Sequence, residues 1–167
     1  MVGYGVASWA LSNGISVPYS VQPEPDLITV PKTPAEMWEA RRKFRRSEHR
    51  TGPGAHAGLG LPYYVQATSP LRRYLDLLVH QQIHAFLSGN RPMASDQVDR
   101  RISQAELQIP RVRKSEGLSN RHWTLAYLLR NPEWNGGAVV VRANQGGNTV
   151  IVPELAIEGE LPSRETV

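Results

Sequence analysis

Apolar residues in the middle of the chain recur with the spacing of one face of an α-helix. They follow residues 63–67, which are typical of an extended segment, and stand at Leu71, Tyr74, Leu75, Leu78, Ile83, Phe86 and Leu87. Thr68 or Ser69 can cap the first free amides, and Pro70 suits the first helical position, where its missing N–H costs nothing. We therefore expect a helix that begins at Thr68-Ser69-Pro70 and packs its apolar face on a core.

Before this helix, the chain carries the signals of two others. A short amphipathic helix is predicted by apolar residues at Val2, Val6, Trp9 and Ala10, and it should end at Asn13-Gly14. Residues 15–21 are expected to be extended. A capping box, Thr33-Pro34-Ala35-Glu36, begins the second helix, which we expect to carry Arg41, Arg42, Lys43, Arg45 and Arg46. The Gly-rich residues 47–60 are interpreted as a loop.

After the central helix, a stop at residues 88–92 precedes a long helical segment. Ser95 should cap it, and Val98, Ile102 and Ala105 share its apolar face. Pro110 lacks the N–H that a helix interior needs, so it should kink or break the helix before it resumes and ends at Asn131-Pro132. Two strands, 138–142 and 149–155, then flank a Gly-rich turn and predict a hairpin.

Composition narrows the class of protein but not its partner. With 167 residues, 40% of them hydrophobic and 20% charged, the chain can build an ordinary core. No run of eighteen apolar residues is present, so we expect no membrane partner. The absence of cysteine fits a reducing compartment, and we expect a cytoplasmic protein. The net charge of +4 only weakly favours a polyanionic partner.

Much of the positive charge is concentrated in one run of residues, and this run favours a nucleic acid as the polyanionic partner. Trp38 and Phe44 interleave with the basic residues Arg41, Arg42, Lys43, Arg45 and Arg46. Basic residues with aromatic neighbours can follow a nucleic-acid backbone, so Arg41, Arg42, Arg45 and Arg46 are candidate RNA-binding residues. A solvated basic face explains the run equally well.

The predicted start of the central helix favours an anion. Free N–H groups and the helix dipole meet two hydroxyls, Thr68 and Ser69, and two guanidiniums, Arg72 and Arg73. The planar fork of arginine matches two phosphate oxygens, so the arrangement suits a phosphodiester. An ordinary capped helix with solvated arginines is the alternative for such a short pattern.

The full string from Tyr64 to His80 resembles the motif of the ribonuclease II / ribonuclease R (RNB) family of exoribonucleases. It has the form Tyr-x-x-x-Thr-Ser-Pro-Leu-Arg-Arg-Tyr-x-Asp-Leu-x-x-His, with Ala67 where the family usually has an aromatic and Leu71 where isoleucine is commoner. Residues 56–61, residues 1–19 and residues 119–123 are also similar to the family. Gly5 lies near a place where the family usually has asparagine.

This resemblance implies an α+β fold and an enzymatic function. Residues 1–133 would be the helix-rich C-terminal part of an RNB catalytic domain, and residues 134–167 the beginning of an OB-type RNA-binding barrel. The implied activity is processive, Mg²⁺-dependent, 3′-to-5′ hydrolysis of RNA to nucleoside 5′-monophosphates, with Arg72 at the scissile phosphate. A non-catalytic RNA-binding module is the alternative. A helical DNA-binding domain would leave residues 68–73 unexplained.

We do not expect this chain to supply the carboxylate ligands for the metal ions of such a site. Two-ion hydrolysis needs clustered carboxylates, and the aspartates Asp26, Asp76, Asp96 and Asp99 form no dense cluster in the sequence. In the family, the metal-binding aspartates lie in an earlier part. The resemblance therefore implies that the chain is a fragment starting mid-fold, and that a separate polypeptide supplies these ligands.

Four residues near the motif have two interpretations each. Arg73 holds a neighbouring phosphate or pairs with Asp76 three residues later. Tyr64 stacks on a base or, more commonly for an aromatic residue, is buried. Asp76 is expected to orient Arg72 or Arg73 rather than bind metal. His80 is expected to be a packed, hydrogen-bonded helix residue rather than a catalytic base.

Overall fold

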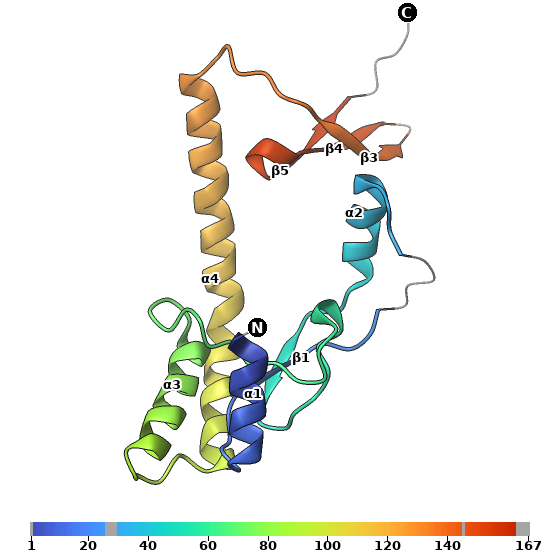
Figure 1. Ribbon diagram of the computed structural model, residues 1–167. Helices are drawn as coiled ribbons and strands as arrows, with labels where there is room; N and C mark the ends of the chain where they lie inside the picture. Colours follow the sequence, from blue (N-terminus) through green and yellow to red (C-terminus); the bar gives the residue numbers. More distant parts are fainter. Residues whose placement is uncertain (1, 26–29, 145, 163–167) are drawn as a thin grey trace, which may run out of the picture. The chain divides into compact units, whose positions relative to one another are not determined.

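The computed structural model describes residues 2–25, 30–144 and 146–162, which form an α+β structure of two compact units (Figure 1). The first unit comprises Met1–Pro25 and Phe44–Arg111, and the second comprises Asp26–Lys43 and Val112–Val167. The elements in chain order are α1 (Val2–Ser12), β1 (Tyr19–Val21), α2 (Pro34–Lys43), β2 (Glu48–Arg50), η1 (Ala57–Leu59), α3 (Tyr74–Leu87), α4 (Ser95–Arg130), β3 (Val139–Asn144), β4 (Gly147–Val152), η2 (Pro153–Leu155) and β5 (Ile157–Leu161).

In the core of the first unit, α1 packs through a face made of small residues. Ala7 and Ala10 of α1 are buried against Val17, Tyr19 and Val65. Gly3 lies on the same face, where a Cβ atom would overlap the ring of Tyr64, so only glycine allows this approach. The prediction of α1 and of its end at Asn13-Gly14 is confirmed, and Gly14 has a φ of 63°. The predicted apolar face is wrong at Val2, which is 63% exposed because the small residues face the core.

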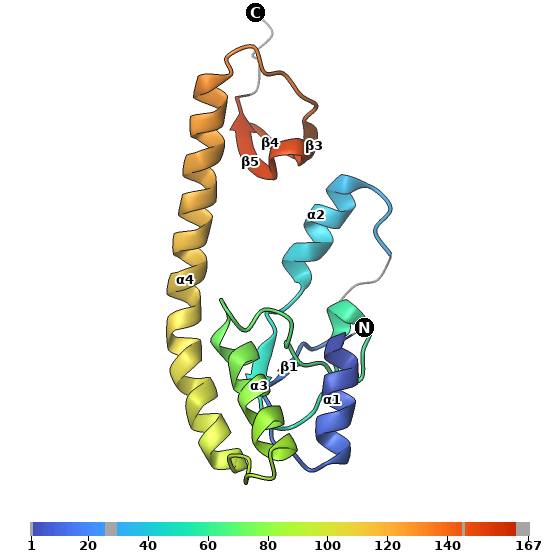
Figure 2. The same cartoon turned by 60° about the vertical axis from the view of Figure 1, so that its left-hand side comes forward.

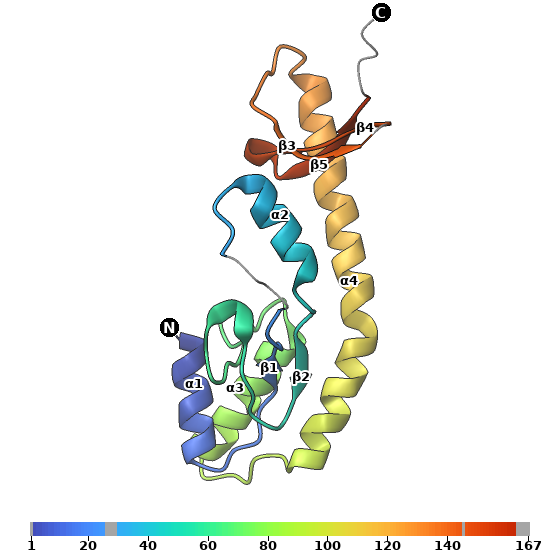
Figure 3. The same ribbon diagram turned by 90° about the vertical axis from the view of Figure 1, so that its right-hand side faces the viewer.

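A strand, β2, lies within residues 47–60, which were predicted to be a loop, and it pairs with β1 in residues 15–21, which were expected to be extended. In β2, Glu48 to Arg50 pair antiparallel with Val21 to Tyr19 of β1, as Figure 3 shows. The His49 N–H donates to Glu106 Oε1 at 3.1 Å, and Thr51 Oγ1 donates to Asp99 at 2.9 Å. Both acceptors belong to α4, so a tertiary contact stabilises a segment whose own sequence has few strand signals.

A second core joins α3 to the first half of α4. Leu75 and Leu78 of α3 pack against Val98 and Ile102 of α4, and all four lie on the apolar faces that the spacing predicts for the two helices. The predicted stop after α3 is confirmed at Ser88, and Gly89 has a φ of 71°. Figure 2 shows α3 beside this part of α4.

The two details predicted for α4 differ in the structure. Ser95 is the first helical residue and not the cap; the N–H of Ala94 is bound by Gln97 Oε1 at 3.0 Å, and the Ser95 hydroxyl donates to Thr51. Pro110 does not break the helix, which continues to Arg130, so this part of the prediction is wrong; a kink at Pro110, its alternative, stays a prediction. Proline removes one N–H, so the carbonyl of Glu106 loses its partner within the helix.

The second unit contains a three-stranded antiparallel sheet in the order β3-β4-β5. The predicted hairpin is confirmed, with Val139 opposite Ile151; Gln145 of its turn lies outside the described residues. β4 ends before Pro153, which begins η2, so the predicted extension of this strand to residue 155 is wrong. The sequence did not predict β5, because its Glu158, Gly159 and Glu160 are exposed and leave little apolar pattern.

The helix that opens with the capping box belongs to the same unit as this sheet. Thr33 Oγ1 accepts from the Glu36 N–H at 3.2 Å, and Glu36 Oε2 accepts from the Thr33 N–H at 3.1 Å, which confirms the box. The N–H of Lys32, at 2.7 Å from Glu36 Oε2, and the N–H of Thr33 lower the pKa of the Glu36 carboxyl. α2 contacts β3, and Trp38 Nε1 donates to Glu158 at 3.0 Å. The compact unit therefore includes residues on both sides of the predicted 133/134 domain boundary, which stays a prediction.

None of the helices in the described residues is long and apolar enough to cross a membrane.

Candidate phosphate-binding site

The segment between the extended residues and α3 is a turn and not the first turn of the helix. The N–H groups of Arg72 and Arg73 donate to the Ser69 carbonyl at 3.2 and 3.0 Å, and Pro70 occupies the second position of this turn. α3 begins at Tyr74, and Arg73 before it has an extended backbone with φ −122° and no side-chain cap. The predicted helix start at residues 68–70 is therefore wrong, and Leu71 is fully exposed instead of facing the core.

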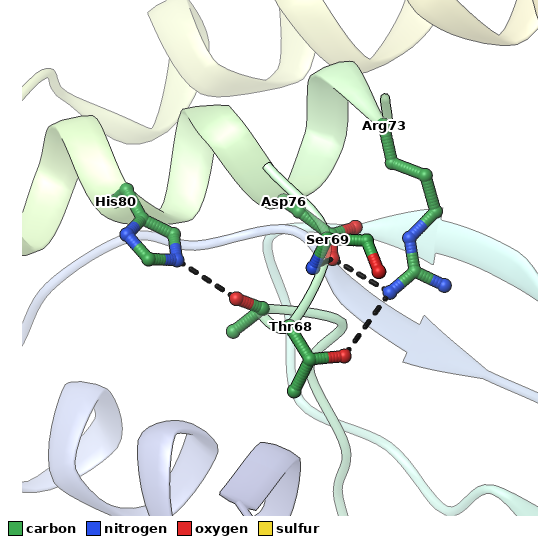
Figure 4. Close-up of polar contacts among 6 residues, drawn as sticks. Thr68, Ser69, Arg73, Asp76 and His80 are labelled. Carbon is green, nitrogen blue, oxygen red and sulfur yellow. Dashed lines mark hydrogen bonds and ion pairs between the residues drawn. The ribbon is translucent and has the colours of Figure 1, made fainter. Parts of the chain in front are cut away.

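Asp76 explains why the helix starts late. Its carboxylate is fully buried in the first turn of α3, and Oδ2 accepts from the Ser69 N–H at 2.8 Å. The same oxygen accepts from Arg73 Nη2 at 2.7 Å, and Arg73 also reaches Thr68 Oγ1 at 3.4 Å (Figure 4). A buried carboxylate needs such partners, and its place near the start of α3 is favoured by the helix dipole. Ser69 is thus bound through its backbone and is not a cap.

Arg73 was expected either to hold a phosphate or to pair with Asp76, and in the structure it forms the ion pair with Asp76. The expectation that Asp76 orients an arginine is met by this contact. The Asp76 carboxylate holds the Arg73 guanidinium on the turn, where its side chain is 32% exposed. Binding of a phosphate by Arg73, Thr68 or Ser69 stays a prediction.

His80 holds the other end of the same segment. Its Nε2 lies 2.8 Å from the Ala67 carbonyl, so Nε2–H is the donor (Figure 4). This contact confirms His80 as a hydrogen-bonded helix residue, but His80 is exposed, so the expectation that it is packed is wrong. Asp76 and His80 are four residues apart, and both reach from α3 to the chain before it, so residues 67–73 are fixed at two points.

Arg72 differs from Arg73 in having an unoccupied guanidinium. Its side chain is exposed, and among the residues that the structure describes none forms a hydrogen bond or an ion pair with it. Its backbone is nevertheless held, because its N–H donates to Ser69 within the fixed turn. The turn therefore presents an exposed arginine, with no side-chain partner among the described residues, on a constrained backbone, which is a suitable arrangement for an anion.

Tyr64 is packed on its own chain. Its ring lies against Gly3 and meets His56 edge-on, with ring centroids 5.5 Å apart. Burial lowers the pKa of His56, which favours the neutral ring in this contact. Tyr64 is half-buried in these contacts, so the interpretation as a buried aromatic is met only in part, and stacking of Tyr64 on a base stays a prediction.

The basic run does not form one helical surface. α2 ends at Lys43, so Arg41 and Arg42 lie in its last turn, and the expectation that this helix also carries Arg45 and Arg46 is wrong. The boundary between the two compact units falls between Lys43 and Phe44. Arg42 lies over the Trp38 ring, 4.6 Å from its centroid, a cation–π contact that occupies part of its surface. All four arginines are exposed.

Replacing Arg41, Arg42, Arg45 and Arg46 together with alanine tests this run. Each phosphate contact on a single strand contributes a slope of about −0.7 in log K against log salt, so four lost contacts should visibly flatten the salt dependence of RNA binding. The measurement is fluorescence anisotropy of a labelled single-stranded RNA at several salt concentrations. An unchanged slope in the quadruple variant would show that the run is a solvated face.

The described residues do not fit a two-ion Mg²⁺ site. No group of three or more His, Asp or Glu side chains in the described part of the chain could hold a metal ion. Asp76 is neutralised by Arg73, Asp96 pairs with Arg100 at 2.7 Å, and Asp99 accepts from Thr51. Asp26 lies outside the described residues.

The structure shows a contact beside the turn, between Arg101 and Tyr74, that the sequence did not predict. Arg101 Nη1 of α4 donates to the hydroxyl of Tyr74 at 2.8 Å. The two residues are 27 positions apart. Helical spacing shows only near neighbours within one helix, so no pattern in the chain could have paired them.

Comparison with known proteins gives a family match. Residues 35–89 match the model of the RNB domain. An uncharacterized ribonuclease of Synechocystis is 34% identical over an alignment of 174 positions, gaps included, which covers 98% of this chain and 26% of the relative. The chloroplastic/mitochondrial ribonuclease II of Arabidopsis thaliana is 33% identical, over 78% of this chain and 17% of the relative. The chain thus spans about a quarter or less of these curated relatives.

Solved structures agree at the level of the fold. The Dss1 exoribonuclease of Candida glabrata superposes with a TM-score of 0.66 at 20% identity, covering 99% of this chain and 24% of that protein. Mycoplasma genitalium RNase R in complex with ribose-methylated single-stranded RNA gives a TM-score of 0.60 at 18% identity, over 96% of this chain and 32% of that protein. By its motif, its sequence relatives and its fold, this chain belongs to the RNB family of ribonucleases II and R.

Proposed function

We propose that the chain is part of a processive 3′-to-5′ exoribonuclease in which Arg72 binds the scissile phosphate. The observation that carries this proposal is the exposed Arg72 guanidinium, which has no partner in the part of the chain that the structure describes, on a turn held by Asp76 and His80. Arginine matches phosphate oxygens with two parallel N–H groups. The names of the relatives support hydrolysis of RNA, and a related RNase R binds single-stranded RNA in a solved structure.

The proposed reaction is the attack of water on the phosphorus of the last phosphodiester. The bond to the 3′ oxygen of the preceding nucleotide breaks, and the released nucleotide keeps its 5′ phosphate. Negative charge grows on the phosphate oxygens in the transition state, and the Arg72 guanidinium, carried by a backbone that the turn holds, stabilises this charge. Bound Mg²⁺ would supply an activated water and further charge stabilisation.

The carboxylates for Mg²⁺ come from outside this chain in our proposal. The described residues contain no carboxylate cluster for two ions, and the RNB resemblance locates the metal-binding aspartates in an earlier segment. We propose that a separate polypeptide carries this segment. "Assembled enzyme" below means this chain together with that segment. The OB-type barrel proposed for residues 134–167 is supported by the antiparallel order of β3, β4 and β5. Cytoplasmic localisation stays a prediction.

An RNA-binding module without catalysis is the second candidate, and the same absence of a carboxylate cluster from the described residues favours it. To distinguish the two candidate functions, the chain is co-expressed with the aspartate-bearing segment and the complex is purified by size-exclusion chromatography. We expect Mg²⁺-dependent shortening of a 5′-labelled single-stranded RNA and release of nucleoside 5′-monophosphates, identified by chromatography.

The controls for this assay are the same complex in EDTA and each polypeptide alone. Binding of RNA by the complex with no digestion in Mg²⁺ would favour the binding module. Mg²⁺-dependent digestion by the 167-residue chain alone would contradict the proposal that its carboxylates come from elsewhere.

A further inference from the structure

Arg101 and Tyr74 form a polar pair beside the turn that carries Arg72. Arg101 Nη1 donates to the Tyr74 hydroxyl oxygen at 2.8 Å. Tyr74 is the first residue of α3, and Arg101 lies on α4. The two helices are held together here by the buried residues Leu75, Leu78, Val98 and Ile102. The pair therefore has a fixed backbone on both sides, although both side chains reach the surface.

The charge of Arg101 is not neutralised within the described residues. The phenol that it contacts is a neutral acceptor, and no described Asp or Glu lies within ion-pair distance of it. The preceding residue shows the contrast, because Arg100 pairs with Asp96 at 2.7 Å one helical turn earlier. A guanidinium has five N–H donors, so one bond to Tyr74 leaves most of its donors free.

The contact also directs the Tyr74 hydroxyl. Its oxygen accepts from Arg101, so its own proton remains to be donated to another group. Tyr74 is 42% exposed and Arg101 is exposed, so both sets of donors reach solvent. A hydroxyl and a guanidinium that donate side by side, with one net positive charge, suit an oxyanion such as a phosphate.

The pair lies close to Arg72 along the chain. Tyr74 follows Arg72 by two residues, so their Cα atoms can be at most about 7 Å apart. A single strand of RNA presents a series of phosphates, and neighbouring donors can bind successive ones. We propose that Arg101 and the Tyr74 hydroxyl bind the RNA phosphate next to the one bound by Arg72. This inference rests on the proposed function, because it takes RNA as the ligand.

The test compares Arg101→Ala with Arg100→Ala in the assembled enzyme. Equilibrium binding of a fluorescent single-stranded RNA is measured in EDTA, where no digestion is expected, between 50 and 200 mM salt. Loss of one phosphate contact should flatten the slope of log K against log salt by about 0.7. Between 50 and 200 mM salt, the fold-drop in affinity of the Arg101 variant should therefore be roughly 2.5 times smaller than that of the wild type. The Arg100 variant should keep the slope, since Asp96 already neutralises Arg100.

Two further variants separate binding from a structural role. Arg101→Lys keeps the charge and should keep most of the salt slope. Tyr74→Phe removes only the hydroxyl and should weaken binding with little change in the slope. Thermal unfolding of each variant is measured in parallel. Equal salt slopes for Arg101→Ala and Arg100→Ala, or a drop in melting temperature with unchanged RNA binding, would overturn the proposal. If Arg101→Ala flattens the salt slope but Arg72→Ala is fully active, the proposed role of Arg72 is wrong, while binding of a phosphate by Arg101 and Tyr74 is supported.

Discussion

Replacing Arg72 with alanine in the assembled enzyme should lower kcat by about 10²-fold or more, while the affinity for RNA changes much less. The free guanidinium on a fixed turn is aimed, in our proposal, at a phosphate whose charge grows in the transition state. Removing one preorganised donor of this kind typically costs ~2.7–4 kcal/mol of transition-state stabilisation. Ground-state binding is shared among many contacts along the RNA, so losing one of them has a small effect.

Single-turnover decay of a labelled RNA at saturating enzyme measures this effect, because it separates the chemical step from product release. Arg72→Lys is the informative second variant: it keeps a positive charge but loses the fork, and it should recover only part of the rate. Arg100→Ala, which removes an exposed arginine already paired with Asp96, serves as the control for net charge. A wild-type rate constant for Arg72→Ala would rule out the proposed clamp.

Replacing Asp76 with asparagine should both destabilise the protein and slow catalysis. The carboxylate is fully buried and accepts from the Ser69 N–H and from Arg73, and asparagine keeps its shape without its charge. Hydrogen bonds to charged groups contribute about 1.5–3 kcal/mol each, and the partial exposure of Arg73 reduces the loss from the ion pair. We expect a loss of about 2–3 kcal/mol in the free energy of unfolding. We also expect kcat to fall by about tenfold or more, because the turn that carries Arg72 is released.

Urea unfolding and the single-turnover assay are used together for this variant. Asp96→Asn is the matched control, since it removes a carboxylate from an exposed i, i+4 pair that should contribute no more than about 0.5 kcal/mol. If Asp76→Asn unfolds no more easily than Asp96→Asn, the buried ion pair does not hold the turn. If it is destabilised but fully active when folded, Asp76 does not position Arg72.

Several local features were determined by the sequence alone. The capping box of Thr33 and Glu36 is present with both of its hydrogen bonds, and the stops at Gly14 and Gly89 have the positive φ angles that glycine accepts. The hairpin of β3 and β4 and the buried apolar faces of α3 and α4 also follow from local periodicity. The RNB motif was visible in the chain because it is a contiguous string. These signals act within a few residues, so no tertiary contact was needed to recognise them.

The tertiary structure decided the conformation of the motif. Thr68, Ser69 and Pro70 have the composition of a helix start, but the buried Asp76 binds the Ser69 N–H and Arg73, and the helix begins at Tyr74. Two arginines that are equivalent by composition thereby acquire different partners. The division of the basic run and the contact of Arg101 with Tyr74 likewise depend on groups far apart in the chain. Burial of a charge is costly, so the three-dimensional positions of its few partners, rather than local propensity, determine the local conformation.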